Sequence, residues 1–301
     1  MRIGLGIGLN RFRGGQGGAA VVGLLDSYKG SAFAMAPDTL LYSTYSATDD
    51  ISGSVTNSDT GQFSVAILRD SDNAVRSFTP AEVADGTANT WVQAGVGGAA
   101  NGFVRRGYDQ SVTALDVSNL NHADQDSTPA MPKLFDSSTG LILENGKAAL
   151  DFDGVNDSLV TSYSVSQPIT GISVFSTRVT SSSAMAVFGG SNGNSRISHI
   201  RSGTNFGSYF GALNLISSTG IDTNQHLHFV VINGTNSSYF YDGVNTDNGN
   251  AGSLDLINLS IGVGAITSYD GLGQFFAVYP ANQSTNRNAI ETAINNEYNI
   301  Y

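Results

Sequence analysis

Residues 147–160, KAALDFDGVNDSLV, contain the pattern on which the assignment of the fold depends. Four acidic or amide side chains fall within this short stretch: Asp151, Asp153, Asn156 and Asp157. The apolar residues Leu150 and Phe152 alternate with acids, so in a strand the apolar side chains face inward and the acids face outward. DGVND then predicts a turn, and SLV predicts the start of a return strand. The stretch therefore predicts a sandwich hairpin rather than a catalytic cluster.

The composition is typical of an all-β protein with many turns. The chain has 301 residues, 36 of them glycine, and only 13% of its residues are charged. A chain of this length buries roughly three quarters of the surface that its unfolded form exposes, so it can form a core without covalent links. There is no cysteine, which excludes disulfide scaffolds, thiolate metal sites and cysteine nucleophiles.

The charge of the chain argues against nucleic acid as a partner. The formal net charge is −11 and the isoelectric point is about 4.5, whereas phosphate binding depends on clustered Lys and Arg. The apolar run IGLGIGL near the N-terminus is short and broken by glycine. We therefore predict neither an export signal nor insertion into a membrane.

Residues 1–20 form a distinct N-terminal segment. Its apolar and basic residues are Ile3, Leu5, Ile7, Leu9, Arg11 and Arg13. The apolar residues alternate with glycine, which is a strand pattern with one bare face, so this strand is weak alone. We predict an extended arm that becomes ordered by adding to another chain's sheet or groove. A disordered, glycine-rich leader is the alternative.

The rest of the chain divides at about residue 135. Residues 21–135 predict a β-rich region, packed on the sandwich or part of it, with a hairpin at 63–78 and a short helix around Trp91. Residues 136–301 contain short strands at close spacing, separated by Gly, Asn, Asp and Ser. This spacing predicts an antiparallel β-sandwich or barrel rather than alternating βαβ units.

A C-terminal helix is predicted over residues 283–301. Ser284 is the expected N-cap, and apolar residues recur at helical spacing after it. These residues are Ile290, Ala293, Ile294 and Tyr298. They predict one apolar stripe that packs on the sandwich.

Three segments of the C-terminal half resemble the concanavalin A-like, laminin G-like jelly rolls common in bacteriophage virion proteins and bacterial surface proteins. They are KAALDFDGVNDSL, HLHFVVINGTNSSYFYDGV and GQFFAVYPANQSTNRNAIETAINNEYNIY. In that family the corresponding segments are an FDG hairpin, a strand ending in DG, and a last strand followed by a helix. The resemblance implies an all-β jelly roll with a C-terminal helix.

Segments upstream are similar to phage proteins related to the arabinofuranosidase B catalytic domain. ILRDSDNAVRSF and NGFVRRGYDQS carry this similarity, the second through its YDQS motif. The sequence departs from the family where Gly107 stands in place of a favoured Trp, and it lacks the vicinal cysteines of the fungal enzymes. No catalytic residue is therefore carried over from the resemblance.

Candidate site residues are few. Asp109 in YDQS is the acid to test for catalysis, although a loop role in which it accepts backbone N–H groups fits the same pattern. His226 and His228 share one face of a strand, a spacing that suits either a metal or a structural role. The loop residues Asp153, Asn156 and Asp157 offer the oxygen ligands that calcium prefers. No other cofactor is expected.

The sequence predicts a non-enzymatic phage virion protein, such as a head-decoration or tail-fibre subunit. The arm would attach it to other virion subunits, and the sandwich would bind a host-surface glycan or another subunit. We expect a homo-oligomer located in the virion and assembled in the host cytoplasm. The alternative is a glycoside hydrolase or carbohydrate-binding module of the same fold, because function depends on sites that are added to a fold.

Overall fold

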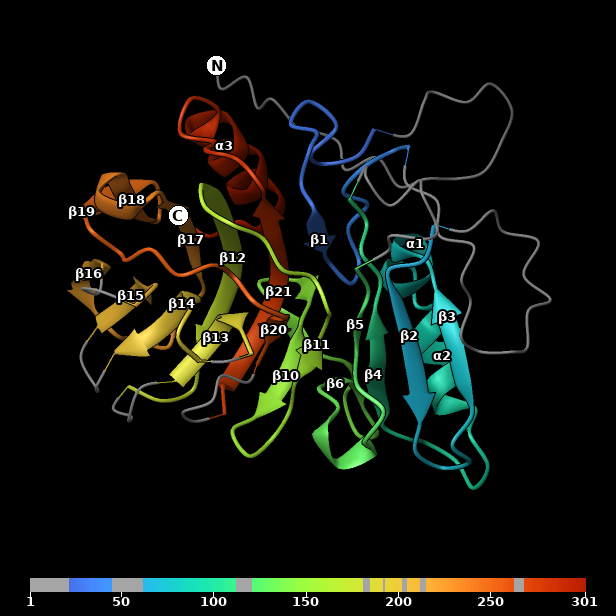
Figure 1. The fold of residues 1–301 in the computed structure, drawn as a ribbon. Helices are drawn as coiled ribbons and strands as arrows, with labels where there is room; N and C mark the ends of the chain where they lie inside the picture. The colour runs from blue at the N-terminus through green and yellow to red at the C-terminus, as the bar shows by residue number, and fades with distance from the viewer. Residues whose placement is uncertain are drawn as a thin grey trace, which may run out of the picture.

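The computed structural model describes residues 22–44, 62–111, 121–180, 185–191, 193–201, 205–211, 215–262 and 268–301. The predicted arm and its attachment residues Ile3, Leu5, Ile7, Leu9, Arg11 and Arg13 lie outside this range. The described chain is mostly β, with one large antiparallel sheet that is nearly closed and few helices (Figure 1). This confirms the all-β class.

The N-terminal strands form one side of the sheet. They are β1 (Phe33–Met35), β2 (Val65–Arg69), β3 (Val75–Phe78), β4 (Gly102–Gly107), β5 (Ala123–Asp124), β6 (Lys133–Asp136) and β7 (Gly140–Leu141), and a separate small hairpin contains β8 (Leu143–Glu144) and β9 (Lys147–Ala148). β2 pairs with β3 from Val65 opposite Phe78 to Leu68 opposite Val75. The predicted hairpin at 63–78 is confirmed.

The remaining strands form two branches. Their bounds are β10 (Leu150–Asp153), β11 (Leu159–Val160), β12 (Ile169–Thr177), β13 (Met185–Gly190), β14 (Arg196–Arg201), β15 (Asn205–Tyr209), β16 (Leu215–Gly220), β17 (His226–Ile232), β18 (Ser237–Tyr241), β19 (Val244–Gly249), β20 (Leu259–Ile261) and β21 (Asp270–Tyr279). One branch runs β10–β21–β12–β17–β18–β19, and the other runs β11–β20–β13–β14–β15–β16. The hairpin between β17 and β18 matches the strand pattern of residues 226–244.

The predicted hairpin at 147–160 is wrong, although its alternation is right. Leu150 and Phe152 are buried, whereas Asp151 is partly exposed and Asp153 is exposed. However, β10 pairs with β21 and β6, while β11 pairs with β20 and β5. The turn therefore passes the chain from one branch to the other. A turn sequence does not distinguish these two outcomes, because the partner strands β5, β6, β20 and β21 all lie outside the turn segment.

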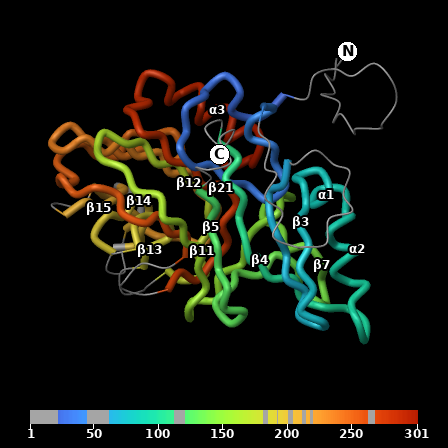
Figure 2. The backbone as a smooth tube through the Cα atoms, turned by 45° about the vertical axis from the view of Figure 1, so that its right-hand side comes forward, coloured from blue at the N-terminus to red at the C-terminus, as the bar shows by residue number. Residues whose placement is uncertain are grey.

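Three α-helices are present in the described residues: α1 (Pro80–Ala84), α2 (Thr87–Gln93) and α3 (Arg287–Tyr298). α1 and α2 lie beside β2 and β3, and α3 lies at the other end of the molecule (Figures 1 and 2). Trp91 is in α2, as predicted. The predicted N-cap is wrong, because α3 begins after Asn286 rather than after Ser284. None of the described helices is long and apolar enough to cross a membrane.

Apolar side chains form two clusters, one on each face of the central strands. The larger cluster includes Phe152, Phe175 and Phe276. The second contains Phe229 and Phe275 together with the buried stripe of α3, namely Ile290, Ile294 and Tyr298. Because α3 covers its outer face, β12 is buried along its whole length. The predicted stripe is confirmed at Ile290, Ile294 and Tyr298, whereas Ala293 is only partly buried. The division of the chain into domains stays a prediction.

Candidate functional site

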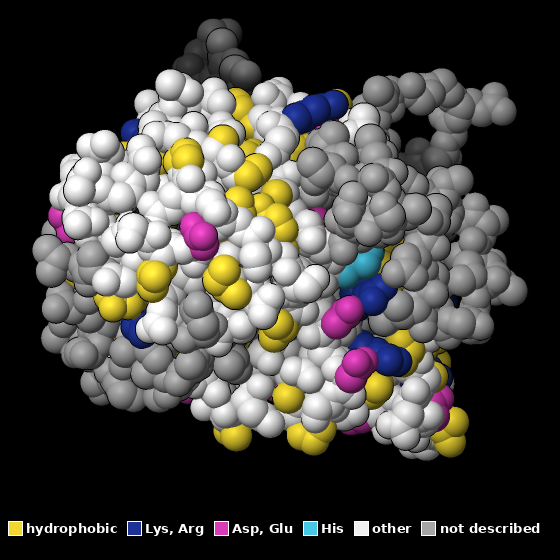
Figure 3. Space-filling model, in the orientation of Figure 1, with side chains coloured by type: hydrophobic (Ala, Val, Ile, Leu, Met, Phe, Trp, Pro, Cys, Tyr) yellow, Lys and Arg dark blue, Asp and Glu magenta, His cyan; other side chains and the backbone are white. Residues whose placement is uncertain are grey.

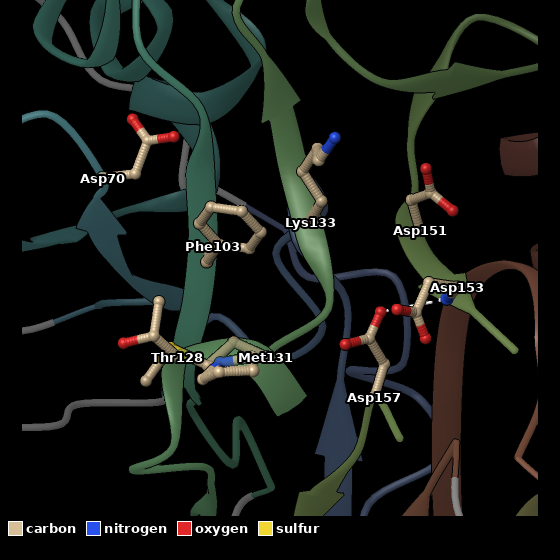
Figure 4. Close-up of a pocket in the computed structure, with 9 residues that line it drawn as sticks. Asp70, Phe103, Thr128, Met131, Lys133, Asp151, Asp153 and Asp157 are labelled. Carbon is tan, nitrogen blue, oxygen red and sulfur yellow. Dashed lines mark hydrogen bonds between the residues drawn. The ribbon is translucent and has the colours of Figure 1, made fainter. Parts of the chain in front are cut away.

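A cavity of about 490 Å³ opens where β4, β6 and β10 lie side by side (Figure 4). The floor of the cavity is formed by residues that are paired between neighbouring strands. Phe103 of β4 lies opposite Lys133 of β6, and Lys133 lies opposite Asp151 of β10. Side chains in register on neighbouring strands point to the same face. Aligned positions therefore present an aromatic ring, an ammonium and a carboxylate to one hollow.

Two further acids join Asp151 at this cavity. Asp153 follows at i+2 on β10 and so faces the same side as Asp151. Asp157 comes from the turn that leads to β11, and Figure 4 shows it beside Asp153. Met131 and Thr128 lie on the opposite side of the hollow. The cavity thus combines carboxyl groups with apolar surface.

Asp157 is the most perturbed acid of the cavity. Only 5% of its surface is exposed, and its Oδ2 accepts the Asp153 backbone N–H at 2.9 Å. Burial raises the pKa of Asp157 to about 7, and the negative charges of Asp153 and Asp151 add to this effect. Desolvation and like charge both disfavour the carboxylate. Asp157 is therefore a carboxylic acid with a proton to give near neutral pH.

Asp151 has a different environment. Its Oδ1 accepts a hydrogen bond from Arg178 Nη2 at 2.5 Å, while Arg178 Nη1 also contacts Asp270 Oδ1 at 3.2 Å and the Phe152 carbonyl at 3.1 Å. The cavity therefore brings together one carboxyl group whose pKa is raised and one carboxyl group that is paired with a guanidinium.

Two of the three candidate calcium ligands, Asp153 and Asp157, use a carboxylate oxygen to form the turn. Asp153 Oδ1 accepts the backbone N–H groups of Val155 at 2.8 Å and Asn156 at 3.4 Å, and Asp157 Oδ2 binds back to Asp153. In the part of the chain that the structure describes, no group of three or more His, Cys, Asp or Glu is placed to hold a metal ion. Calcium binding at Asp153, Asn156 and Asp157 stays a prediction.

Asp109 lies away from the cavity and is fully enclosed. It is 1% exposed, and its Oδ1 accepts the N–H groups of Ala34 at 3.0 Å and Ser111 at 2.9 Å. Burial raises the pKa of Asp109 to about 6. The side chain ties β1 to the segment that follows β4. These are the backbone N–H contacts that a loop role of Asp109 predicts.

The two histidines of β17 have separate partners. His226 lies between two carboxylates, with Nδ1 at 2.7 Å from Asp242 Oδ2 and Nε2 at 2.8 Å from Asp222 Oδ1. His228 is fully buried, and its Nδ1 is 2.8 Å from the Tyr239 hydroxyl. The two rings thus have different hydrogen-bonding partners.

The His226 contacts predict a pH-dependent stability. Burial alone would lower the pKa of His226, but the hydrogen bonds and charges of Asp242 and Asp222 outweigh it and raise the pKa. A raised folded-state pKa stabilises the fold fully below the unfolded value of about 6.5, and this contribution is lost as pH rises through the folded value. We expect the free energy of unfolding, measured in urea, to fall over that window. His226→Gln should remove this dependence on pH. If the free energy of unfolding of the variant still falls with pH as in the unmodified protein, His226 is not the group responsible.

Charged side chains are sparse on the face shown in Figure 3, and those present gather over β4 and β5. Arg106 pairs with Asp124 at 2.6 Å, and Arg105 pairs with Asp126 at 3.0 Å. The rest of this face is mainly neutral. The low charged fraction of the sequence, 13%, is visible on this face.

No protein-family model and no curated protein matches the sequence. Among solved structures, a variant of a GH54 α-L-arabinofuranosidase soaked with 4-nitrophenyl α-L-arabinofuranoside matches over 91% of this chain and 65% of that one, with a TM-score of 0.55 and 13% identity. The chain shares the fold of this glycoside hydrolase.

Two other solved structures match over about half of the chain. A Trypanosoma rangeli sialidase covers 48% of this chain, with 14% identity and a TM-score of 0.37. A heptameric SAP-like pentraxin from Limulus polyphemus covers 47%, with 14% identity and a TM-score of 0.37. The chain spans only 27% of the sialidase, 65% of the arabinofuranosidase and 79% of the pentraxin.

The predictions of a non-enzymatic phage virion subunit and of no enzymatic activity are wrong on this comparison. A structure that matches nearly the whole chain is a glycoside hydrolase, which favours the alternative stated from the sequence. The departures at Gly107 and at the missing cysteines concern single positions. They do not alter the strand order that carries the fold. Because identity is low, the comparison shows the fold, and the reaction depends on the site.

Sequence reasoning missed most of the cavity. It singled out Asp153 and Asp157 as calcium ligands and treated Asp151 as part of an outer polar face, and it did not single out Lys133 or Arg178. The sequence did contain one indication of the cavity. In LDFD, residues 150–153, apolar and acidic residues alternate, which places Asp151 and Asp153 on one face of the strand, close to Asp157 in the turn. The partner strand β6, which completes the floor, cannot be inferred from the local sequence.

Proposed function

We propose that this protein is a glycoside hydrolase whose active site is the cavity between β4, β6 and β10. The observation that carries the proposal is the contrast between Asp157, with a pKa raised to about 7, and Asp151, paired with Arg178, in one hollow. Glycosidases use two carboxyl groups, one as a general acid and the other as a nucleophile or base. The two branches of strands would form the layers of a jelly roll that supports this site.

Each group has a defined role in the proposed reaction. Asp157 donates its proton to the glycosidic oxygen as the bond to the leaving group breaks. Asp151, held by Arg178, either attacks the anomeric carbon or removes a proton from the attacking water. Phe103 and Met131 supply apolar surface on which a sugar ring can lie. The negative charge of Asp153 helps to keep Asp157 protonated.

The activity is tested with a panel of 4-nitrophenyl glycosides that includes the α-L-arabinofuranoside. We expect release of 4-nitrophenol from at least one neutral glycoside, and loss of that release in Asp151→Asn. Asp126→Asn is the matched control, because Asp126 is 84% exposed and pairs with Arg105 outside the cavity. No release from any glycoside, or equal release by the Asp151→Asn variant, would overturn the proposal.

The pH dependence of kcat/KM gives a second test. Because Asp157 must be protonated to act as an acid, activity should fall as pH rises through about 7. We expect this fall to move to lower pH in Asp153→Asn, since removing the negative charge of Asp153 lowers the pKa of Asp157. If kcat/KM of the Asp153→Asn variant falls at the same pH as that of the unmodified protein, the charge of Asp153 does not affect the pKa of Asp157.

A glycan is the proposed ligand of the site, and this proposal retains one partner that the sequence predicts. The virion subunits, the homo-oligomer and the virion location remain predictions. Size-exclusion chromatography with light scattering would test the oligomeric state of the full chain.

A further inference from the structure

The carboxylates of the cavity are not balanced by the cations beside it. Four aspartates line the hollow, namely Asp70, Asp151, Asp153 and Asp157, and Lys133 is its one basic lining residue among the described part of the chain. Lys133 Nζ is 3.3 Å from Asp136 Oδ2, so Asp136 neutralises part of the positive charge of Lys133. The hydroxyl and N–H of Ser138, followed by Lys133, hold the pKa of Asp136 well below its usual range. Asp136 therefore remains an anion that neutralises Lys133.

Arg178 does not supply the missing positive charge either. Its guanidinium contacts both Asp151 and Asp270, so one cation serves two carboxylates. Among the described residues, Asp70 and Asp153 pair with no Lys or Arg. Asp70 accepts the Asn101 N–H at 3.0 Å and the Asn101 side-chain amide at 2.8 Å, and Asp153 accepts the N–H groups of its own turn. Neutral donors fix the position of a carboxylate without cancelling its charge.

We propose that the cavity accepts uncharged sugars and rejects sugars that carry a carboxylate, and that Asp70 and Asp153 determine this selectivity. This inference rests on the proposed function for its site, but it concerns the charge of the ligand rather than the reaction. Asp70 follows the end of β2, and Asp153 ends β10, so Phe103 and Lys133 lie between them in Figure 4. A carboxylated sugar lying over Phe103 would approach both aspartates. Asp70 and Asp153 are both exposed, so their repulsion of a carboxylate is expected to be sensitive to salt.

Paired ligands test the inference. They are the 4-nitrophenyl glucoside and glucuronide, and the corresponding galactoside and galacturonide, which differ only at C6. Binding to the full chain is measured by calorimetry, and kcat/KM is measured where hydrolysis occurs. We expect the neutral member of a pair to bind at least about tenfold more tightly than its uronide, and we expect salt between about 0.05 M and 0.5 M to narrow the difference.

Asp70→Asn identifies the residue responsible. The Asn side chain keeps an oxygen for the Asn101 N–H, so the turn is preserved, and we expect the preference for the neutral ligand to fall several-fold. Asp126→Asn is the control and should leave the preference unchanged. If Asp70→Asn does not fold, the salt dependence of the unmodified protein still tests the selectivity. A preference for the neutral ligand that salt does not reduce would contradict it.

The outcomes separate the two proposals. Neutral ligands that bind in preference but are not hydrolysed would support the selectivity and contradict the hydrolase. Hydrolysis of both members at equal kcat/KM would support the hydrolase and overturn the selectivity. Binding of neither member of any pair would overturn the selectivity as well.

Discussion

Replacing Asp157 with Asn should lower kcat/KM for a neutral glycoside by roughly 10²- to 10⁴-fold, the range that general acid catalysis contributes. The amide has nearly the same shape as the carboxyl group, and its oxygen can still accept the Asp153 N–H that Asp157 Oδ2 accepts at 2.9 Å. The turn is therefore expected to remain intact. What is lost is the proton that burial keeps on Asp157 near pH 7.

Two measurements separate lost chemistry from lost structure. Substrates with better leaving groups need less protonation, so the defect of Asp157→Asn should shrink as the pKa of the released phenol falls. The free energy of unfolding of the variant should stay close to that of the unmodified protein. A variant that hydrolyses all phenols at the original rate would show that Asp157 is not the acid.

Replacing Phe152 with Ala should lower the free energy of unfolding by about 3–5 kcal/mol, the cost of removing a buried aromatic side chain. Phe152 is 0% exposed, and its ring centroid lies 5.3 Å from that of Tyr269. Its ring also fills the space where a Cβ on Gly262 would lie, at 2.4 Å from Phe152 Cε1. Truncation therefore leaves a void between β10 and the chain after β20. Urea unfolding followed by tryptophan fluorescence measures the change.

Val155→Ala is the matched control in the same segment. Val155 is 72% exposed at the turn, so its truncation should change the free energy of unfolding by less than about 0.5 kcal/mol. Equal effects of the two substitutions would mean that the inner and outer faces of residues 147–160 are assigned wrongly.

Local patterns in the sequence were enough to predict several elements. The alternation around Phe152, the Asp/Asn turn at 63–78 and the helical spacing of Ile290, Ile294 and Tyr298 all depend on neighbours within a few residues. The alternation around Phe152 has the period of a strand, and the spacing of Ile290, Ile294 and Tyr298 has the period of a helix. The all-β class and the buried stripe of α3 follow from them directly.

The site depends on long-range pairing, which local patterns do not encode. Asp151 faces Lys133 only because β10 pairs with β6, and Asp151 is ion-paired only because β12 ends at Thr177, just before Arg178. The wrong hairpin and the missed cavity have this common cause. Asp109 shows the converse, since a motif that suggested chemistry serves to hold β1 in place.

The most direct test of the account is a crystal structure of the Asp157→Asn variant soaked with a neutral 4-nitrophenyl glycoside. We predict that the sugar lies over Phe103 and that its glycosidic oxygen is within about 2.6–3.2 Å of the side chain at position 157. The anomeric carbon should face Asp151. A sugar bound elsewhere on the protein, with the cavity between β4, β6 and β10 empty, would contradict the account.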